Sequence, residues 1–197
     1  MRACLWCLWL LCSPVMAQQD WQAQLWPEHQ ARVLEAREIA NDWRERYAAA
    51  DFDRAGMNML AELLDAPVLP IESAQLLGSW RVRSIQTNTL GVYVYPYFRG
   101  EIERSEAGLV LRKFTGSQRR LGHLYPVLDA PESMVFLGGL TVNDSPQLPY
   151  SRSPAGLASQ PAETDSAGVL SVLAPGRLLL ILDARWGEGF ELYELRR

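Results

Sequence analysis

The stretch LLGSWRVRSIQ, residues 76–86, lies where the chain changes from a helical to a β pattern. Before it, apolar residues recur every three or four positions, which is the spacing of an amphipathic helix. From Pro70 onward, apolar and polar residues alternate, as they do along half-buried strands. Gly78 and Trp80 stand at the start of the first predicted strand. They either open a closed β-barrel or are a turn glycine followed by an ordinary core tryptophan.

The segment after Pro70 predicts eight short strands, separated by turns rich in glycine and other turn-forming residues. The predicted strands are 80–87, 93–103, 109–114, 119–127, 133–142, 169–174, 177–183 and 190–196. Strands joined by tight turns are typical of an antiparallel meander, and a meander of this size avoids exposed edges most simply by closing on itself. We therefore predict a mainly β protein with an antiparallel meander barrel of about eight strands. A two-sheet sandwich and a barrel left open on one side are the alternatives.

An α-helical hairpin is predicted before the barrel. Range 27–50 has apolar residues at helical spacing and a proline near its first turn, and range 53–65 follows with Asp51 or Asp53 as its cap. So short a link favours two antiparallel helices, and we expect their apolar stripe to pack on the rest of the domain. The helical prefix, 18–70, and the barrel, 71–197, are therefore expected to form one structural unit.

One connection is longer than the others. Range 143–167 is rich in serine, proline and alanine, and it is too long and polar for a plain hairpin. It is either a lid over a site or a surface insertion.

The first residues, 1–17, have the layout of a secretory signal peptide: Arg2, an apolar run over 5–11, and a small residue at Ala17. The apolar run is much shorter than the roughly 20 residues that span a bilayer, although a short membrane anchor is the alternative. We expect cleavage after Ala17, a periplasmic or secreted protein, and no transmembrane segment in the mature chain.

Composition excludes several kinds of site. The three cysteines all lie in the leader, at Cys4, Cys7 and Cys12, so the mature chain is expected to have neither a disulfide nor a thiolate metal site. Two histidines, His29 and His123, are too few for a multi-histidine metal site, and we expect no metal and no cofactor. The net charge of −4 and the lack of a long basic run argue against nucleic-acid binding.

The chain resembles two groups of proteins. Gly78 and Trp80 in the first strand, with Arg196 or Arg197 at the end of the last, resemble the calycin barrels, which include lipocalins and avidins. That resemblance implies that Trp80 plugs one end of the barrel beneath a terminal arginine, which we assign to Arg196. The segments LLGSWRVRSIQ, VYPYFRGEI, KFTGSQRRLGHLYP and FELYELRR resemble domain-of-unknown-function family 4893, a family of secreted proteobacterial proteins. This second resemblance implies an exported barrel with a helical prefix and no known activity.

Two segments carry the candidate ligand-binding residues. In the second predicted strand, alternation sends Val94, Pro96, Phe98 and Ile102 to one face, expected to point inward. The opposite face then forms a recognition row of Tyr93, Tyr95, Tyr97 and Arg99. The segment FTGSQRRLGH adds a possible anion contact at Arg119 and Arg120, followed by His123. The alternative for both segments is ordinary strand and turn chemistry.

The function favoured by these patterns is non-enzymatic binding of a small apolar or amphipathic ligand, or of an envelope partner, through the barrel interior or its mouth. No nucleophile elbow, phosphate-binding loop or HExxH sequence is present. An enzyme that pairs His123 with Glu101 or Asp183 is one alternative, and a solidly packed structural envelope protein is the other. A pocket of about 300 Å³ or more with convergent polar groups would favour the binding protein or the enzyme.

Overall fold

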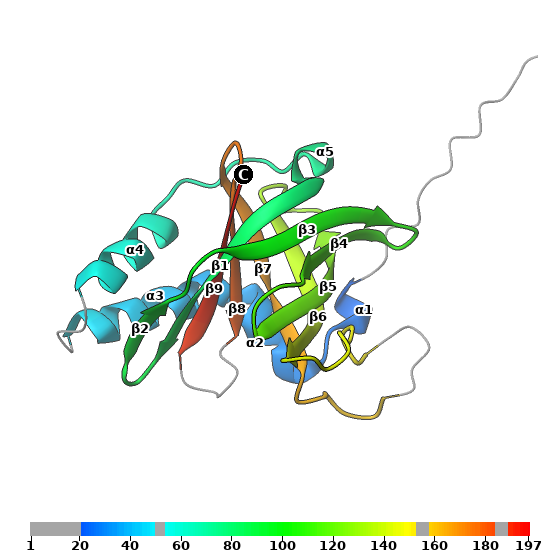
Figure 1. The fold of residues 1–197 in the computed structure, drawn as a ribbon, viewed down its shortest axis with the longest axis horizontal. Helices are drawn as coiled ribbons and strands as arrows, with labels where there is room; N and C mark the ends of the chain where they lie inside the picture. Colours follow the sequence, from blue (N-terminus) through cyan, green and yellow to red (C-terminus); the bar gives the residue numbers. More distant parts are fainter. Residues whose placement is uncertain (1–20, 50–53, 153–157, 184–188) are drawn as a thin grey trace, which may run out of the picture.

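The barrel and its helices are seen in a computed structural model that describes residues 21–49, 54–152, 158–183 and 189–197. The helices lie along one side of the barrel and at one of its ends (Figure 1). The predicted leader, 1–17, falls outside the described residues.

Consecutive strands pair antiparallel around a closed sheet. The strands are β1 (Gly78–Asn88), β2 (Gly91–Val94), β3 (Phe98–Ser105), β4 (Gly108–Lys113), β5 (Gln118–Pro126), β6 (Ser133–Val142), β7 (Asp165–Ala174), β8 (Arg177–Asp183) and β9 (Phe190–Arg196). β9 pairs back with β1, which closes the barrel. β2 and β3 pair with opposite halves of β1 and share one position, so the barrel has eight positions. The predicted eight-stranded antiparallel meander barrel is confirmed.

The second predicted strand, 93–103, is interrupted between β2 and β3. Val94 lies opposite Ile85 and Phe98 lies opposite Val82, so four steps along this strand match three steps along β1. The extra residue is a bulge next to Pro96, which has no N–H to donate to the ladder. A one-residue shift moves every later side chain to the other face. The predicted inward row was therefore wrong at Val94, which shares the outer face with Ile85.

The same bulge divides the predicted tyrosine row. Tyr93 lies opposite Gln86, whose side chain points into the barrel, whereas Arg99 lies opposite Arg81 on the outer face. Cross-strand partners share a face, so Tyr93 and Arg99 do not belong to one surface.

The long connection after β6 is shorter than predicted, because β7 begins at Asp165 rather than at Val169.

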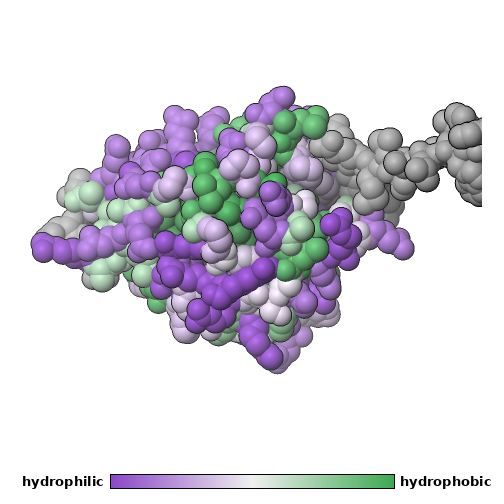
Figure 2. All heavy atoms as spheres, turned by 90° about the horizontal axis from the view of Figure 1, so that it is seen from above, coloured by the Kyte–Doolittle hydropathy of each residue, from purple (hydrophilic) through white to green (hydrophobic). Residues whose placement is uncertain are grey.

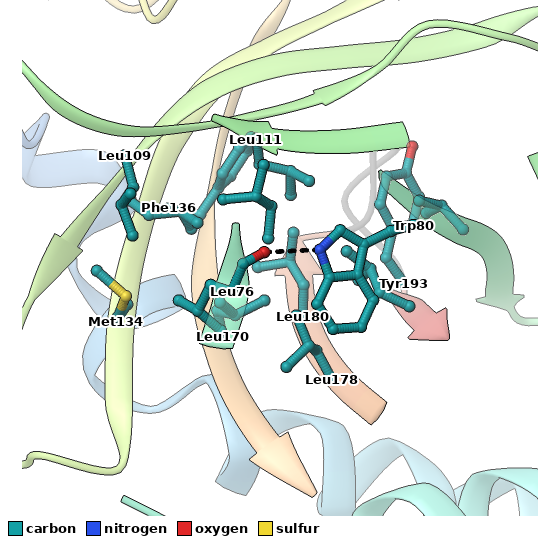
Figure 3. Close-up of a cluster of buried hydrophobic side chains, with 14 of the residues drawn as sticks. Leu76, Trp80, Leu109, Leu111, Met134, Phe136, Leu170, Leu178, Leu180 and Tyr193 are labelled. Atoms are coloured by element: carbon teal, nitrogen blue, oxygen red, sulfur yellow. Dashed lines mark hydrogen bonds between the residues drawn. The ribbon is translucent and has the colours of Figure 1, made fainter. Parts of the chain in front are cut away.

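One half of the barrel interior is apolar. Its side chains come from β1, from β3 to β9, and from α5 (Ser73–Leu76). They pack around Trp80 (Figure 3). The buried members are Leu76, Trp80, Val82, Ile102, Leu109, Leu111, Leu124, Met134, Phe136, Leu170, Val172, Leu178, Leu180, Leu182, Tyr193 and Leu195. These large side chains are buried against one another, so this half is an apolar core.

The helices before the barrel are α1 (Trp21–Gln24), η1 (Pro27–His29), α2 (Gln30–Leu34), α3 (Ala36–Ala49) and α4 (Arg54–Leu64). The predicted helix over 27–50 is divided, because Glu35 leaves helical geometry at φ −114° and ψ 15°. α3 and α4 contact each other and bury Ala40, Tyr47, Leu60 and Leu63 against the outer face of β8 and β9. No helix in the described ranges has both the length and the apolar character that crossing a membrane requires.

The end of the molecule at which α5 lies is largely hydrophilic. Seen from above, hydrophilic side chains surround a hydrophobic patch near the centre of this face (Figure 2).

Candidate functional site

The second half of the barrel interior is built around a buried ion pair. Arg120 Nη2 lies 2.8 Å from Glu191 Oε2, and both side chains are almost fully buried. Arg120 also donates from Nη1 to the Tyr193 hydroxyl at 2.8 Å and from Nε to Ser166 Oγ at 3.1 Å. A buried charge is tolerated when it is paired and hydrogen-bonded in this way.

Glu191 is the acceptor that joins the rest of this network. Ser84 Oγ donates to Glu191 Oε1 at 2.5 Å, and Gln86 Nε2 donates to the same oxygen at 3.2 Å. Lys113 Nζ, also buried, donates to the carbonyls of Thr115, at 3.0 Å, and Gln118. Burial lowers the pKa of Lys113 to about 8, against the opposing effect of Glu191. The polar groups of this half thus form a hydrogen-bonded network inside the barrel.

A cleft lies outside the barrel, between its wall and the first helices. Its volume is about 280 Å³. The helical side is lined by Trp21, Val33, Leu34, Ala36 and Arg37, and the barrel side by Val127, Ala130, Ser133, Val135, Val169, Ser171 and Ile181. Most of these side chains are apolar, which is usual for small-molecule sites.

The cleft forms where the helical layer changes direction. α2 ends at Leu34 and α3 begins at Ala36, and the small side chains of Ser133 and Ser171 face this break from β6 and β7. Leu34 is 62% exposed and stands at the lip. A neighbouring cavity of about 250 Å³ shares Trp21 and Leu34 with the cleft, and its other lining residues come from the first helices and Arg152.

Arg37 is the charged residue in the cleft. Its Nη1 donates to the Leu64 carbonyl at 2.7 Å, while its Nη2 is buried and has no hydrogen-bond partner among the described residues. Burial lowers the pKa of Arg37, and nearby Asp65 opposes this shift. An arginine remains protonated even so, so a cation stands at the wall of the cleft with its unused Nη2 donor enclosed by protein.

The first helices beside the cleft are hydrogen-bonded to the β6–β7 connection and to the start of β7. The Tyr150 hydroxyl accepts from the Trp26 backbone N–H at 3.1 Å and lies 2.7 Å from His29 Nδ1. Trp26 Nε1 also donates to Asp165 Oδ2 at 3.1 Å. The described part of the connection is therefore packed against the helices. Sequence reasoning missed these residues because a contact between His29 and Tyr150 has no local signal.

The predicted binding residues do not come together. Tyr93 on β2 and Tyr95 just after it are exposed, whereas Tyr97 and Arg99 lie on the outer face near β1. Arg119 and Arg120 are neighbours on β5 and point to opposite sides of the sheet. Arg119 donates outside the barrel to the carbonyls of Asn143 and Ser145, and Arg120 lies inside it. The predicted joint anion contact of the two arginines was wrong, because successive strand residues alternate between faces.

His123 lies on the outer side of β5 opposite Val110 and Leu137. Burial lowers its pKa, and its Nδ1 has no hydrogen-bond partner in the described ranges. Glu101 is on β3, with β4 between the two, and the side chain of Asp183 is not among those described. The His–carboxylate pair of the enzyme alternative is therefore not formed by Glu101. The described residues hold no group of acidic, histidine or cysteine side chains able to bind a metal.

Trp80 closes the apolar end of the barrel. Its ring is buried, and its Nε1 donates to the Leu76 carbonyl at 2.7 Å (Figure 3). The guanidinium carbon of Arg197 lies 4.2 Å from the indole centroid, and Gly78, at φ +113°, lets the chain turn beside it. The stacked cation is therefore Arg197 and not the predicted Arg196. Alternation along β9 sends Arg196 to the outer face, where it contacts Glu194 at 2.6 Å.

The comparisons with known proteins identify a family. A family model described as "Domain of unknown function (DUF4893)" matches residues 21–195. Neither the curated proteins nor the solved structures gave a match.

Proposed function

The chain belongs to the DUF4893 family, and we propose that it is an exported, non-enzymatic binding protein that holds a small amphipathic anion in the cleft beside the barrel. The observation that carries this proposal is Arg37, which lines a mostly apolar cleft and has an Nη2 donor without a hydrogen-bond partner among the described residues. The ligand's apolar part would replace water against Val33, Val135 and Val169. Because Nη2 is buried, the Arg37 guanidinium would turn into the cleft and the anionic group would accept its free hydrogen bond.

The energetics favour a ligand with both parts. A buried donor without an acceptor costs about 1–3 kcal/mol, and a hydrogen bond to a charged group returns about 1.5–3 kcal/mol. Apolar burial adds about 25 cal/mol for each Å² removed from water. A cavity of about 280 Å³ is close to the lower end of the range for small-molecule sites. The expected ligand is therefore small, with one anionic head and one short apolar tail.

Binding is favoured over catalysis because the residues that line the cleft include no histidine, cysteine, aspartate or glutamate. The two serines, Ser133 and Ser171, have no base among these lining residues to take their protons. General-base activation of a hydroxyl needs such a partner within hydrogen-bond reach.

The test compares decanoate with decanol, which share a tail and differ in charge. Binding is measured by isothermal titration calorimetry on the wild type and on Arg37→Met, which keeps the apolar stem and removes the cation. We expect decanoate to bind about 10 times more weakly to Arg37→Met, because about 1.4 kcal/mol of charged hydrogen bonding is lost. Decanol binding should be unchanged.

A second pair of variants locates the site. Leu34→Glu places a carboxylate at the lip of the cleft and should abolish decanoate binding. Leu90→Glu is the matched control, because Leu90 is 76% exposed in the β1–β2 hairpin. Equal loss with both variants, or decanoate binding that is insensitive to Arg37→Met and Leu34→Glu, would refute the proposed site.

Export is tested separately. The mature protein from the envelope or the medium is expected to begin at Gln18 and to lack the apolar run over 5–11. Intact mass spectrometry of protein purified from its own host measures this directly. A mass equal to that of all 197 residues would contradict cleavage.

A further inference from the structure

Four arginines form a row across the outer face of the barrel. Arg99 on β3 lies opposite Arg81 on β1, Arg81 lies opposite Arg196 on β9, and Arg196 lies opposite Arg177 on β8. Directly opposite residues have Cβ atoms about 4.5–5.5 Å apart, and like charges at that distance destabilise a sheet. The barrel nevertheless places three such pairs side by side, in a chain whose net charge is −4. We call these four residues the arginine row.

One buried carboxylate organises part of the arginine row. Glu194 is fully buried and accepts from Arg177 at 2.8 Å and from Arg196 at 2.6 Å. A fifth arginine, Arg83, reaches the same carboxylate at 2.6 Å. Burial alone would raise the pKa of Glu194, but hydrogen bonds from the arginines and from the Tyr97 hydroxyl lower it, so Glu194 is ionised at neutral pH. Its single negative charge is shared among three cations.

The charges in this region do not balance. Besides Glu194, the ion pairs of these five arginines include one other carboxylate, Glu62 of α4, which lies 2.7 Å from Arg177. Five guanidinium groups thus face two carboxylates. Among the described residues no carboxylate lies within ion-pair distance of Arg81 or Arg99, and both side chains are exposed. The Arg81 guanidinium lies over the Tyr97 ring and the Arg99 guanidinium over the Phe114 ring. These ring contacts orient the two guanidinium groups without neutralising their charge.

We infer that the arginine row binds a linear polyanion that carries several phosphate groups. Arg177 is mostly buried and is covered by Glu62, so Arg99, Arg81 and Arg196 are the cations of the row that a ligand reaches. Two strand spacings of about 4.8 Å give these three a length of about 10 Å. That length suits a chain of phosphates better than a single one. The planar guanidinium fork matches phosphate oxygens in a bidentate way, which lysine does not. Bound phosphates would also relieve the like-charge contacts along the row.

This surface is independent of the proposed ligand cleft, because the cleft lies against β6, β7 and Ile181 of β8, and no residue of the arginine row lines it. A failure of either proposal therefore leaves the other standing.

The experiment uses inorganic tripolyphosphate as the probe and isothermal titration calorimetry in 20 mM salt. The double variant Arg81→Gln/Arg99→Gln removes the two cations that lack carboxylate partners and leaves Glu194 with its three arginines. We expect its affinity for tripolyphosphate to fall at least tenfold. The control is Arg46→Gln, which removes an exposed arginine of α3 that stacks on Trp43 and belongs to another surface. Its affinity should match that of the wild type.

Two further probes distinguish the source of the negative charge. Vesicles containing phosphatidylglycerol test a membrane surface, and an oligoglutamate peptide tests a carboxylate partner. Preference for tripolyphosphate over both, with binding that weakens steeply as salt rises to 200 mM, supports the inference. Absence of tripolyphosphate binding, equal binding by the double variant, or tighter binding to vesicles or oligoglutamate overturns it.

Discussion

The two halves of the barrel interior are filled in opposite ways. Around Trp80, leucines and aromatic rings pack without ionised side chains inside, and the stacked Arg197 lies at the edge. Around Arg120, the interior of the barrel holds an ion pair, hydroxyl groups and amides instead. The first half depends on apolar packing and the second on the pairing of buried polar groups.

This difference determines how a substitution in each half should lower the stability of the fold. A missing apolar side chain leaves a cavity whose cost depends on how far its neighbours relax. A missing charged side chain leaves its partner buried and unpaired. The same rule separates Arg120 from the arginine row, since the buried arginine is neutralised by Glu191 whereas exposed Arg81 is not neutralised within the described residues.

The largest expected effect is at the apolar end. Trp80→Ala should lower the free energy of unfolding by about 3–5 kcal/mol, because it empties a buried aromatic site. Trp80→Phe should cost less, since it keeps a ring and loses the hydrogen bond to the Leu76 carbonyl. Urea denaturation with an unchanged m-value measures both. A loss below about 1 kcal/mol for Trp80→Ala would mean that this end is not closed by the indole.

The next effect is at the polar half. Glu191→Gln should destabilise the protein by about 3 kcal/mol, because it leaves Arg120 buried without its counterion. Glu101→Gln is the matched control, since the same change on the outer face of β3 should stay within about 0.5 kcal/mol. Equal stabilities of the two variants would show that pairing is unimportant in this half.

Lys113 gives the polar half a pH dependence that the apolar half lacks. Its pKa is about 8 in the folded chain, mainly because of burial, and about 10.4 when unfolded. Between these values the unfolded state binds more protons, so the free energy of unfolding should rise with pH, by about 1–2 kcal/mol after allowance for screening. Denaturation at pH 7.5 and pH 9.5 measures the rise, and Lys113→Met should remove it. A rise of the same size in that variant would assign it to other groups.

The smallest effect is the stacked cation. Arg197→Ala should cost about 0.5–2 kcal/mol, and the double variant with Trp80→Ala should be less destabilised than the sum, because both changes break one contact. Arg196→Ala is the control, because it contacts Glu194 on the outer face and should show no such coupling. Coupling to Arg196 and not to Arg197 would reverse the assignment.

Much of the fold could be predicted because its signals are local. Alternation and turn residues located the strands to within a few residues, except where Pro96 and the bulge split one strand and where β7 began early. The bulge could not be predicted, because it is defined by pairing with β1 and not by the strand's own sequence. That single residue was enough to misplace Val94 and to divide the tyrosine row.

The candidate site was less predictable for a related reason. The pattern around Arg119 and Arg120 indicated an anion contact, but adjacent strand positions face opposite ways, and only the closed barrel shows that one of them is inside. Arg37 had no distinguishing signal in a helix with many charges. Its unused donor exists because the helices pack against the barrel wall and leave a cleft there.

By itself, the sequence determined the class of fold and the order of its elements, since these follow from side-chain periodicity and turn chemistry. The pairing of Trp80 with a C-terminal arginine was implied by the resemblance to the calycin barrels. Tertiary structure decided which arginine stacks on the indole, which charges lie inside the barrel, and that four arginines from four strands stand in one row. The physical reason is that a side chain's environment depends on the register and closure of the sheet, and both are set by strands distant in the chain.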